Sequence, residues 1–374
     1  MNQRREHTPT RDALNRKCSR VRARDKHAFL VLLATGICAF SGLAFAQQVQ
    51  YDVATTRLLQ PLTGTVLSDD DELTQPTRVI AIGGKLVVLD RGADHVVRIY
   101  DASKGNRIAT FGRHGQGPGE FAGAWDLFRS GSSRTIWVLD VSLRRVTALT
   151  LDSLLSGNGY RGDAHLTFSG DGSLQSVRAL GDRGFVGTGT YARGRVAMYS
   201  RTGTFVRMVG DTPRGAPRWA PVVAQDAYAA RLGNDGVTDR VVVAHRWTDR
   251  LEVLDLQGAR VASMDRPLGF EPIISVQSTS RAAFTLDSRR AYLSTVSTDR
   301  HIYALFSGRT EREAGTDNSF GRDVLVFSWN GRLQRILRLD TDVIAIAIDE
   351  SGRALYTLAH EPAPRILRYG LPDM

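Results

Sequence analysis

The stretch that decides the fold is RVIAIGGKLVVLDRGADHVVRIYDASKGNRIATFG, residues 78–112. It holds four short runs rich in Val, Ile and Leu, at 78–83, 85–90, 95–101 and 107–112, and Gly, Asp, Asn and Ser separate them. Short runs of this composition, bounded by turn residues, are typical of β-strands. The connections are too short to join parallel strands, so the stretch predicts a four-stranded antiparallel sheet.

The same pattern recurs along the rest of the chain. Further units of strand-like runs lie at 125–168, 176–209, 227–263, 291–338 and 343–369. The last unit has only three runs, and we expect the strand-like stretch 49–59 to supply its fourth strand. A ring closed in this way leaves no exposed sheet edge between its first and last units. The sequence therefore predicts an all-β fold, a six-bladed β-propeller with an N-terminal strand closing the last blade.

Composition excludes several classes of protein. The 374 residues are 24% charged and 42% hydrophobic, with 36 Gly and 2 Cys. These values do not fit a disordered tail, a collagen or a disulfide scaffold.

The first 46 residues have the pattern of a targeting segment. Nine Lys or Arg precede an uncharged apolar run at 28–46, which ends in the small-x-small triplet Ala44-Phe45-Ala46. We predict a signal peptide at 1–46, cleaved after Ala46, and a single propeller domain at 47–374. The alternative is a retained N-terminal anchor, because about 19 apolar residues approach the ~20 that span a bilayer. The expected location is periplasmic or extracellular, with no membrane span after cleavage.

Removal of that segment changes the charge and the cysteine content. Both cysteines, Cys18 and Cys38, lie within it, so the mature chain would have none. The 40 basic and 36 acidic residues that remain give a net charge of +4. So small an excess does not favour a nucleic-acid partner, which requires clustered Lys and Arg.

The linker after the first unit resembles that of a known repeat family. The segment 108–121, IATFGRHGQGPGEF, resembles the linker of NHL repeats, in which a fourth strand ends in Phe-Gly and a Gly-Pro-Gly-x-Phe turn leads into the next blade. The chain is similar overall to secreted six-bladed propeller proteins of bacteria. A chain that leaves an outer strand for the centre of the next sheet needs glycines with positive φ.

The resemblance also implies candidate metal ligands. In such propellers the second strands end at one mouth of the central channel, where related secreted lyases and lactonases hold a catalytic metal. The corresponding residues here are Asp90, Asp140, His245 and His360. Such ligands suit a divalent metal, zinc or calcium. The alternative is structural, because an Asp before a turn commonly accepts hydrogen bonds from the N–H groups of that turn.

Long connections predict a binding surface. The connections at 114–121, 211–223, 266–280 and 307–322 all emerge on one face of a propeller. Recognition is commonly placed on such loops, and Arg with aromatic residues is the composition of a binding hot spot. The candidate ligand-binding residues are Arg214, Arg218, Trp219, Phe270, Arg309, Arg312 and Phe320. The alternative is that these side chains only pack the loops against the scaffold.

These observations lead to two function hypotheses. The first is an exported, monomeric, non-catalytic binding propeller that recognises a peptide, glycan or protein partner through the loop-rich channel mouth. The second is a metal-dependent hydrolase or lyase with a His/Asp site in the central channel. No Gly-x-Ser-x-Gly motif is present to indicate a serine hydrolase.

Overall fold

The computed structural model of the chain describes residues 48–373, except 130–133, 158–161, 163, 171, 192–193, 212–218, 234–239, 279–280, 316–317 and 350. The predicted signal peptide lies outside the described residues. Residues 45–374 form one compact unit, and the description below concerns that unit alone.

The first three blades follow the predicted pattern of four antiparallel strands. Blade 1 contains β3 (Pro76–Ile82), β4 (Lys85–Asp90), β5 (His95–Asp101) and β6 (Arg107–His114), with β7 (Glu120–Phe121) parallel to β6. Blade 2 contains β8 (Ala124–Arg129), β9 (Thr135–Asp140), β10 (Arg145–Thr150) and β11 (Ala164–Thr167). Blade 3 contains β12 (Ser173–Ala179), β13 (Phe185–Thr190), β14 (Val196–Tyr199) and β15 (Phe205–Val209).

The other three blades complete the ring. Blade 4 contains β16 (Ala230–Gly233), β17 (Arg240–His245), β18 (Leu251–Asp255) and β19 (Arg260–Ser263). Blade 5 contains β22 (Tyr292–Ser297), β23 (His301–Phe306), β24 (Gly321–Ser328) and β25 (Leu333–Val343). Blade 6 contains β26 (Ala345–Ile348), β27 (Ala354–Ala359), β28 (Arg365–Gly370) and β2 (Thr65–Ser68).

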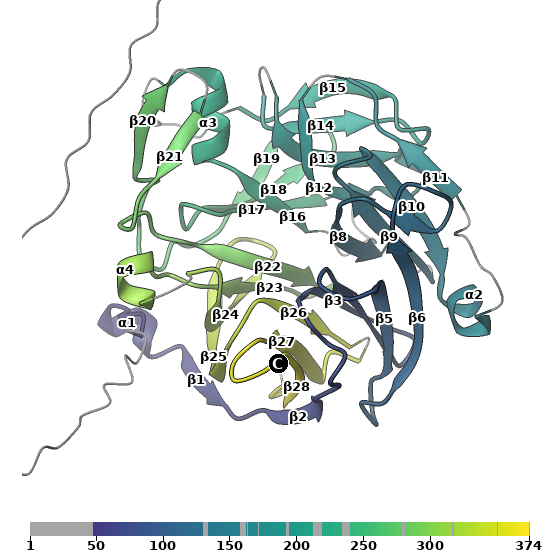
Figure 1. The fold of residues 1–374 in the computed structure, drawn as a ribbon. Helices are drawn as coiled ribbons and strands as arrows, with labels where there is room; N and C mark the ends of the chain where they lie inside the picture. Colours follow the sequence, from purple (N-terminus) through teal and green to yellow (C-terminus); the bar gives the residue numbers. More distant parts are fainter. Residues whose placement is uncertain are drawn as a thin grey trace, which may run out of the picture. The chain divides into compact units, whose positions relative to one another are not determined.

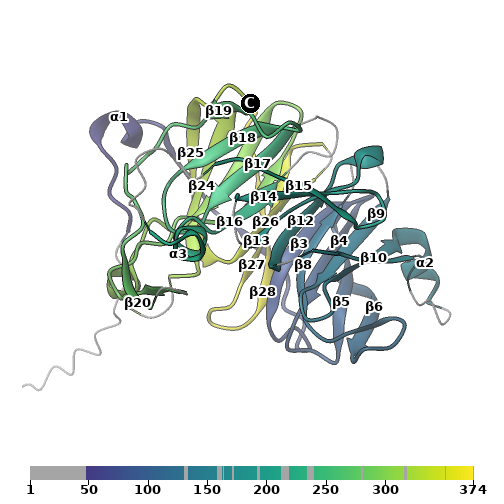
Figure 2. The ribbon, with the colours of Figure 1, turned by 90° about the horizontal axis from the view of Figure 1, so that it is seen from above.

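The first strands of the six blades form a closed inner ring. Each contacts the first strand of the next blade, in the order β3, β8, β12, β16, β22 and β26, and β26 contacts β3 again. Figure 1 shows the blades following one another in chain order until blade 6 lies beside blade 1. From the second side, β3 lies next to β26 and β27 (Figure 2). The predicted six-bladed propeller is confirmed.

An N-terminal strand closes the last blade, but it is not the stretch that the sequence suggested. The closing strand is β2, whose residues 65–68 pair antiparallel with β28. The predicted stretch, 49–59, instead contains the short helix α1 (Val53–Thr56), which Asp52 caps. The next strand, β1 (Leu59–Leu62), runs parallel to β25 at the edge of blade 5. The prediction was wrong by several residues because β-propensity alone does not show which of two adjacent short segments reaches the edge of the last blade.

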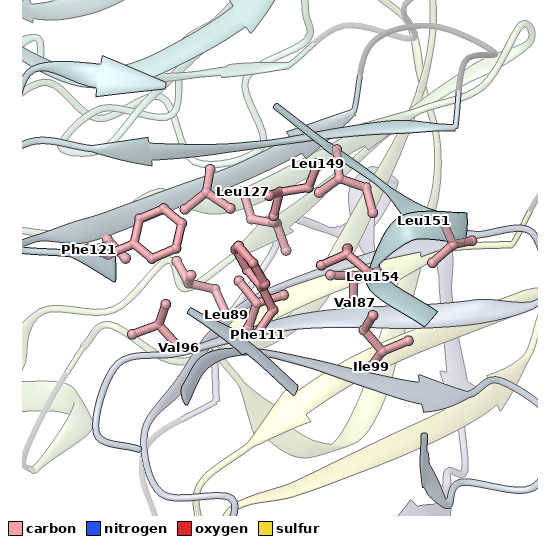
Figure 3. Close-up of a cluster of buried hydrophobic side chains, with 14 of the residues drawn as sticks. Val87, Leu89, Val96, Ile99, Phe111, Phe121, Leu127, Leu149, Leu151 and Leu154 are labelled. Atoms are coloured by element: carbon pink, nitrogen blue, oxygen red, sulfur yellow. The ribbon is translucent and has the colours of Figure 1, made fainter. Parts of the chain in front are cut away.

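The hydrophobic core lies between the blades. The strands β4 and β5 are buried along almost their whole length, because both faces of a blade pack against its neighbours. Figure 3 shows the cluster between blades 1 and 2, in which Leu89 and Val96 face Leu127 and Phe121. Each such side chain contributes roughly 1.5–3 kcal/mol when it is fully buried.

The glycine-rich linker has the geometry that its sequence predicted. Gly112 has a φ of 75°, and a Cβ atom there would lie 2.5 Å from the Phe121 ring. Phe121 packs edge-on against Phe111, with ring centroids 6.2 Å apart. Glycine is required here both for the positive φ and for the close approach of the ring.

Several elements lie in the connections between strands. The helix α2 (Leu151–Ser156) follows β10, and α4 (Glu311–Ala314) lies between β23 and β24. Blades 4 and 5 are joined through the hairpin β20 (Ile274–Ser278) and β21 (Arg281–Phe284). The helix α3 (Pro221–Ala227) precedes blade 4 and contacts β21 (Figure 1). The sequence analysis treated α3 and the hairpin as loop.

Candidate functional site

The central channel contains two adjoining cavities, each of about 260 Å³. The channel cavity is lined by the first strands of all six blades. The mouth cavity is lined mainly by the ends of these strands and by connections on the loop-rich face of the propeller. Arg78 of β3 and Arg231 of β16 line both cavities, so the two meet at these side chains.

A repeated β-bulge shapes the mouth cavity. In β3, β8, β12 and β22 the pairing with the second strand shifts by one residue near the start of the strand. The extra residues are Thr77, Trp125, Gln175 and Leu293. A bulge redirects side chains and is common next to functional sites. Three of these four residues line the mouth cavity: Thr77, Trp125 and Leu293.

One buried carboxylate lies in the channel, and it is fully engaged. Asp126 accepts hydrogen bonds from Arg178 Nη1 at 2.8 Å, Ser176 Oγ at 2.9 Å and Arg78 Nε at 3.3 Å. Burial raises the pKa of Asp126, but Arg178, Arg78 and Arg231 together lower it below its ordinary value. Asp126 is therefore ionised and balances the charge of the arginines beside it.

The mouth cavity has an excess of positive charge. Five arginines line it, and none of its described lining residues is acidic. Within the described part of the chain, the side chains of Arg231 and Arg246 make no hydrogen bond or ion pair, and Arg246 Nε is buried without a partner. Burial lowers the pKa of Arg231 well below its ordinary value, and the charges of Arg78 and Arg246 add to this. Burial, followed by the charge of Arg78, lowers the pKa of Arg246 to about 10.

The other two arginines of the mouth cavity lie against aromatic rings. The Arg91 guanidinium is 4.6 Å from the centroid of the Trp125 ring. Arg290 is buried, lies 4.4 Å from the ring of Trp247, and donates from Nη2 to Ser319 Oγ at 3.2 Å. A cation over an aromatic face is held in place without its charge being neutralised.

The aspartates proposed as metal ligands are occupied by structural contacts. Asp90 accepts from the N–H groups of Thr74 and Gln75 and from Arg98 Nε at 3.1 Å. Asp140 accepts from the N–H groups of Ala122 and Leu143. Both carboxylates are completely buried. These contacts agree with the structural alternative, in which the Asp accepts hydrogen bonds from nearby backbone N–H groups. Most of these donors belong to the chain segment before each first strand, and not to the turn that follows the Asp.

The two histidines are also held by local contacts. His245 is buried, and its Nδ1 lies 3.0 Å from Tyr228 O while its Nε2 lies 3.4 Å from Glu252 Oε2. His360 Nε2 lies 2.7 Å from Pro76 O at the rim of the mouth cavity. Across the described ranges, no three His, Cys, Asp or Glu side chains are grouped closely enough to hold a metal ion. The described residues therefore do not bring Asp90, Asp140, His245 and His360 together as ligands.

The candidate ligand-binding residues have different environments. Phe320 lines the mouth cavity and packs edge-on against His360, with ring centroids 5.2 Å apart. Arg309 is buried, pairs with Asp342 at 3.0 Å, and donates to Phe320 O at 2.9 Å, so it positions this loop.

The described residues among the remaining candidates, Arg312, Phe270 and Trp219, do not line the mouth cavity. Arg312 is exposed and pairs with Asp287 at 2.8 Å. Phe270 packs beside Phe306, and Trp219 packs beside Tyr228. Arg214 and Arg218 lie outside the described residues.

Sequence reasoning missed the arginines of the channel. Arg78, Asp126, Arg178 and Arg231 each lie in the first strand of one of the first four blades. A charged residue within a short, otherwise mostly apolar strand is unusual unless it faces a partner or a cavity. Its recurrence in four successive first strands was the signal that could have identified the channel.

Comparison with known proteins agrees with this architecture. A family model described as "TolB-like 6-blade propeller-like" matches residues 60–351. The chain belongs to this TolB-like family. No curated protein matches the chain in sequence. The NHL resemblance rests on the linker segment 108–121.

Solved structures show the same fold at low sequence identity. One is U3-55K, with a TM-score of 0.50 and 10% identity over 86% of this chain and 100% of that one. Another is a candidate exported protein from Bacteroides fragilis NCTC 9343, with a TM-score of 0.51 and 10% identity over 84% of this chain and 100% of that one. Within the described residues, no helix has the length and apolar character needed to cross a membrane.

Proposed function

We propose that this TolB-like propeller is an exported binding protein that takes a peptide segment of a protein partner into the mouth cavity and catalyses no reaction. The observation that carries the proposal is the mouth cavity itself. It is a cavity of about 260 Å³ on the loop-rich face, lined by arginines and by the rings of Trp125, Phe320 and His360. Arginine and aromatic side chains dominate binding hot spots, because each contributes a large contact area and Arg adds directional donors.

The scaffold supports recognition rather than motion at this site. The residues of the mouth cavity lie on first strands and on connections that are hydrogen-bonded to them. A preformed cavity loses less conformational freedom on binding than a mobile loop does. The predicted leader at 1–46 supports export, and so does the candidate exported protein that shares the fold.

Panning of a phage-displayed random-peptide library tests the proposal. The bait is the protein secreted from its full-length gene, and enriched peptides are compared on the wild type and on Trp125→Ala and Phe320→Ala variants. Arg134→Ala is the matched control, because Arg134 is exposed, pairs with Asp152 at 2.8 Å and does not line the mouth cavity. We expect enriched peptides to lose at least tenfold in affinity for the mouth variants and to bind the control normally.

Two outcomes would overturn the proposal. Peptides that bind all variants equally would place recognition elsewhere. Binding of glycans, but not peptides, that depends on Trp125 and Phe320 would replace the peptide by a glycan at the same site.

A further inference from the structure

The protein balances the positive charges of the mouth cavity only in part. Asp126 accepts from both Arg78 and Arg178, and its charge also acts on Arg231, so this carboxylate is shared among several cations. Arg78 and Arg246 lie close enough to Arg231 for their charges to lower its pKa. An arginine stays protonated in a protein, so the lowered pKa reflects repulsion among cations and poor hydration. An anion in the cavity would relieve both.

The arginines are held on rigid backbone. Arg246 directly follows β17; its N–H donates to Ala229 O at 2.8 Å, and its C=O accepts from Ala291 N at 2.8 Å. Arg231 pairs in register with Ala244 within blade 4. Through its two backbone hydrogen bonds, Arg246 connects the segment that leads into the first strand of blade 4 to the segment that leads into the first strand of blade 5. The guanidinium groups are therefore carried by fixed strands around the cavity, and such preorganisation reduces the cost of binding.

The mouth cavity is of a size that suits a compact group, such as one charged end or side chain of a peptide. Its volume of about 260 Å³ is slightly below the ~300–1,000 Å³ that is usual for small-molecule sites. The planar guanidinium fork matches the two oxygens of a carboxylate or a phosphate, and such pairs are the strongest hydrogen bonds in proteins. The rings of Trp125 and Phe320 line the same cavity and can contact the organic part of the ligand.

We infer that the mouth cavity is an oxyanion site in which Arg231 and Arg246, with Arg78 beside them, bind a carboxylate or phosphate group of the ligand. This inference rests on the proposed function and names the ligand chemistry that the site takes. A carboxylate would come from an acidic side chain or a chain end, and a phosphate from a phosphoryl ester. Both sources present the same paired oxygens.

Calorimetry and thermal unfolding at constant ionic strength test the inference. The probes are sodium succinate and sodium phosphate, with sodium chloride as the reference, because salt screens exposed charges. We expect succinate or phosphate, but not chloride, to bind the wild type and to raise its unfolding temperature. Binding of only one probe identifies the source, and binding of either supports the inference.

Variants locate the binding and separate it from a structural role. Arg231→Gln and Arg246→Gln should weaken anion binding by roughly 10- to 100-fold. Without anion, these variants should unfold at the same or a higher temperature than the wild type, because one repelling charge is removed. Arg134→Gln makes the same change of charge at an exposed ion pair with Asp152 and should bind the anions normally.

Clear results would overturn the inference. The inference is rejected if neither anion binds the wild type. It is also rejected if the wild type, Arg231→Gln and Arg246→Gln bind the anions equally. If the Gln variants fail to fold, Arg91→Gln provides a second test, because Arg91 is exposed at the same cavity. Peptide capture that depends on Trp125 but not on these arginines would leave the proposed function standing and reject the oxyanion site alone.

Discussion

Replacement of Asp90 by Ala should destabilise the protein strongly without affecting any metal content. The Asp90 carboxylate is 0% exposed and accepts from Arg98, whose side chain is also buried. It also accepts from the N–H groups of Thr74 and Gln75. In Asp90→Ala, the remaining carboxylate partner of Arg98 is Glu72, at 3.3 Å, and Glu72 is exposed.

The expected loss follows from the charge that is left behind. Removal of one partner of a buried ion pair costs about 3–5 kcal/mol, because the other charge stays buried, and here the exposed Glu72 compensates Arg98 only in part. The backbone donors of Thr74 and Gln75 also lose their acceptor, which adds to this cost. A loss of this size is a large part of the ~5–15 kcal/mol that stabilises a typical native protein.

Urea unfolding at pH 7, followed by tryptophan fluorescence, measures the effect. The matched control is Asp101→Ala, since Asp101 caps a surface turn and pairs with Lys85 at 2.8 Å. The control should lose much less stability than Asp90→Ala, because solvent screens the charges of a surface ion pair. A loss below about 1 kcal/mol for Asp90→Ala would refute the reasoning. Wild-type protein that falls to the stability of the variant on addition of EDTA would instead identify Asp90 as a metal ligand.

Two further predictions concern ring closure and acid stability. Deletion of 48–58 should lower the unfolding temperature by only a few degrees. Deletion of 48–68 should abolish cooperative thermal unfolding, because it removes β2 from β28. Equal effects of the two deletions would contradict closure by β2. Burial raises the pKa of Glu252, but His245 and Arg195 outweigh this and hold it well below its ordinary value. Its contribution to stability is therefore complete above the unfolded pKa of about 4.3 and is lost as the pH falls below it. Glu252→Gln should be less stable than the wild type at pH 7 in urea and should lose less stability between pH 6 and pH 3; parallel pH profiles would refute this.

The candidate site could be predicted only in part. The sequence analysis placed Phe320 and His360 at the loop-rich mouth of the channel, and both line the mouth cavity. It proposed Asp90 and Asp140 as ligands, although both are satisfied by local donors. Whether an Asp at a strand end faces the channel or its own loops depends on side-chain direction, which a bulge shifts by one residue.

The sequence by itself determined the strands of the blades other than the closing strand, their grouping in fours and the number of blades. These features follow from local rules, namely short β-branched runs, turn residues and glycines at positive φ, such as Gly112. Only the tertiary structure decided that β2 closes the ring and that Arg78, Arg231 and Arg246 meet around one cavity. Arg78 and Arg246 are more than 150 positions apart in the sequence. The closed ring of blades brings such distant positions together. Charge accumulation in the channel is therefore a property of the ring, and no single repeat contains it.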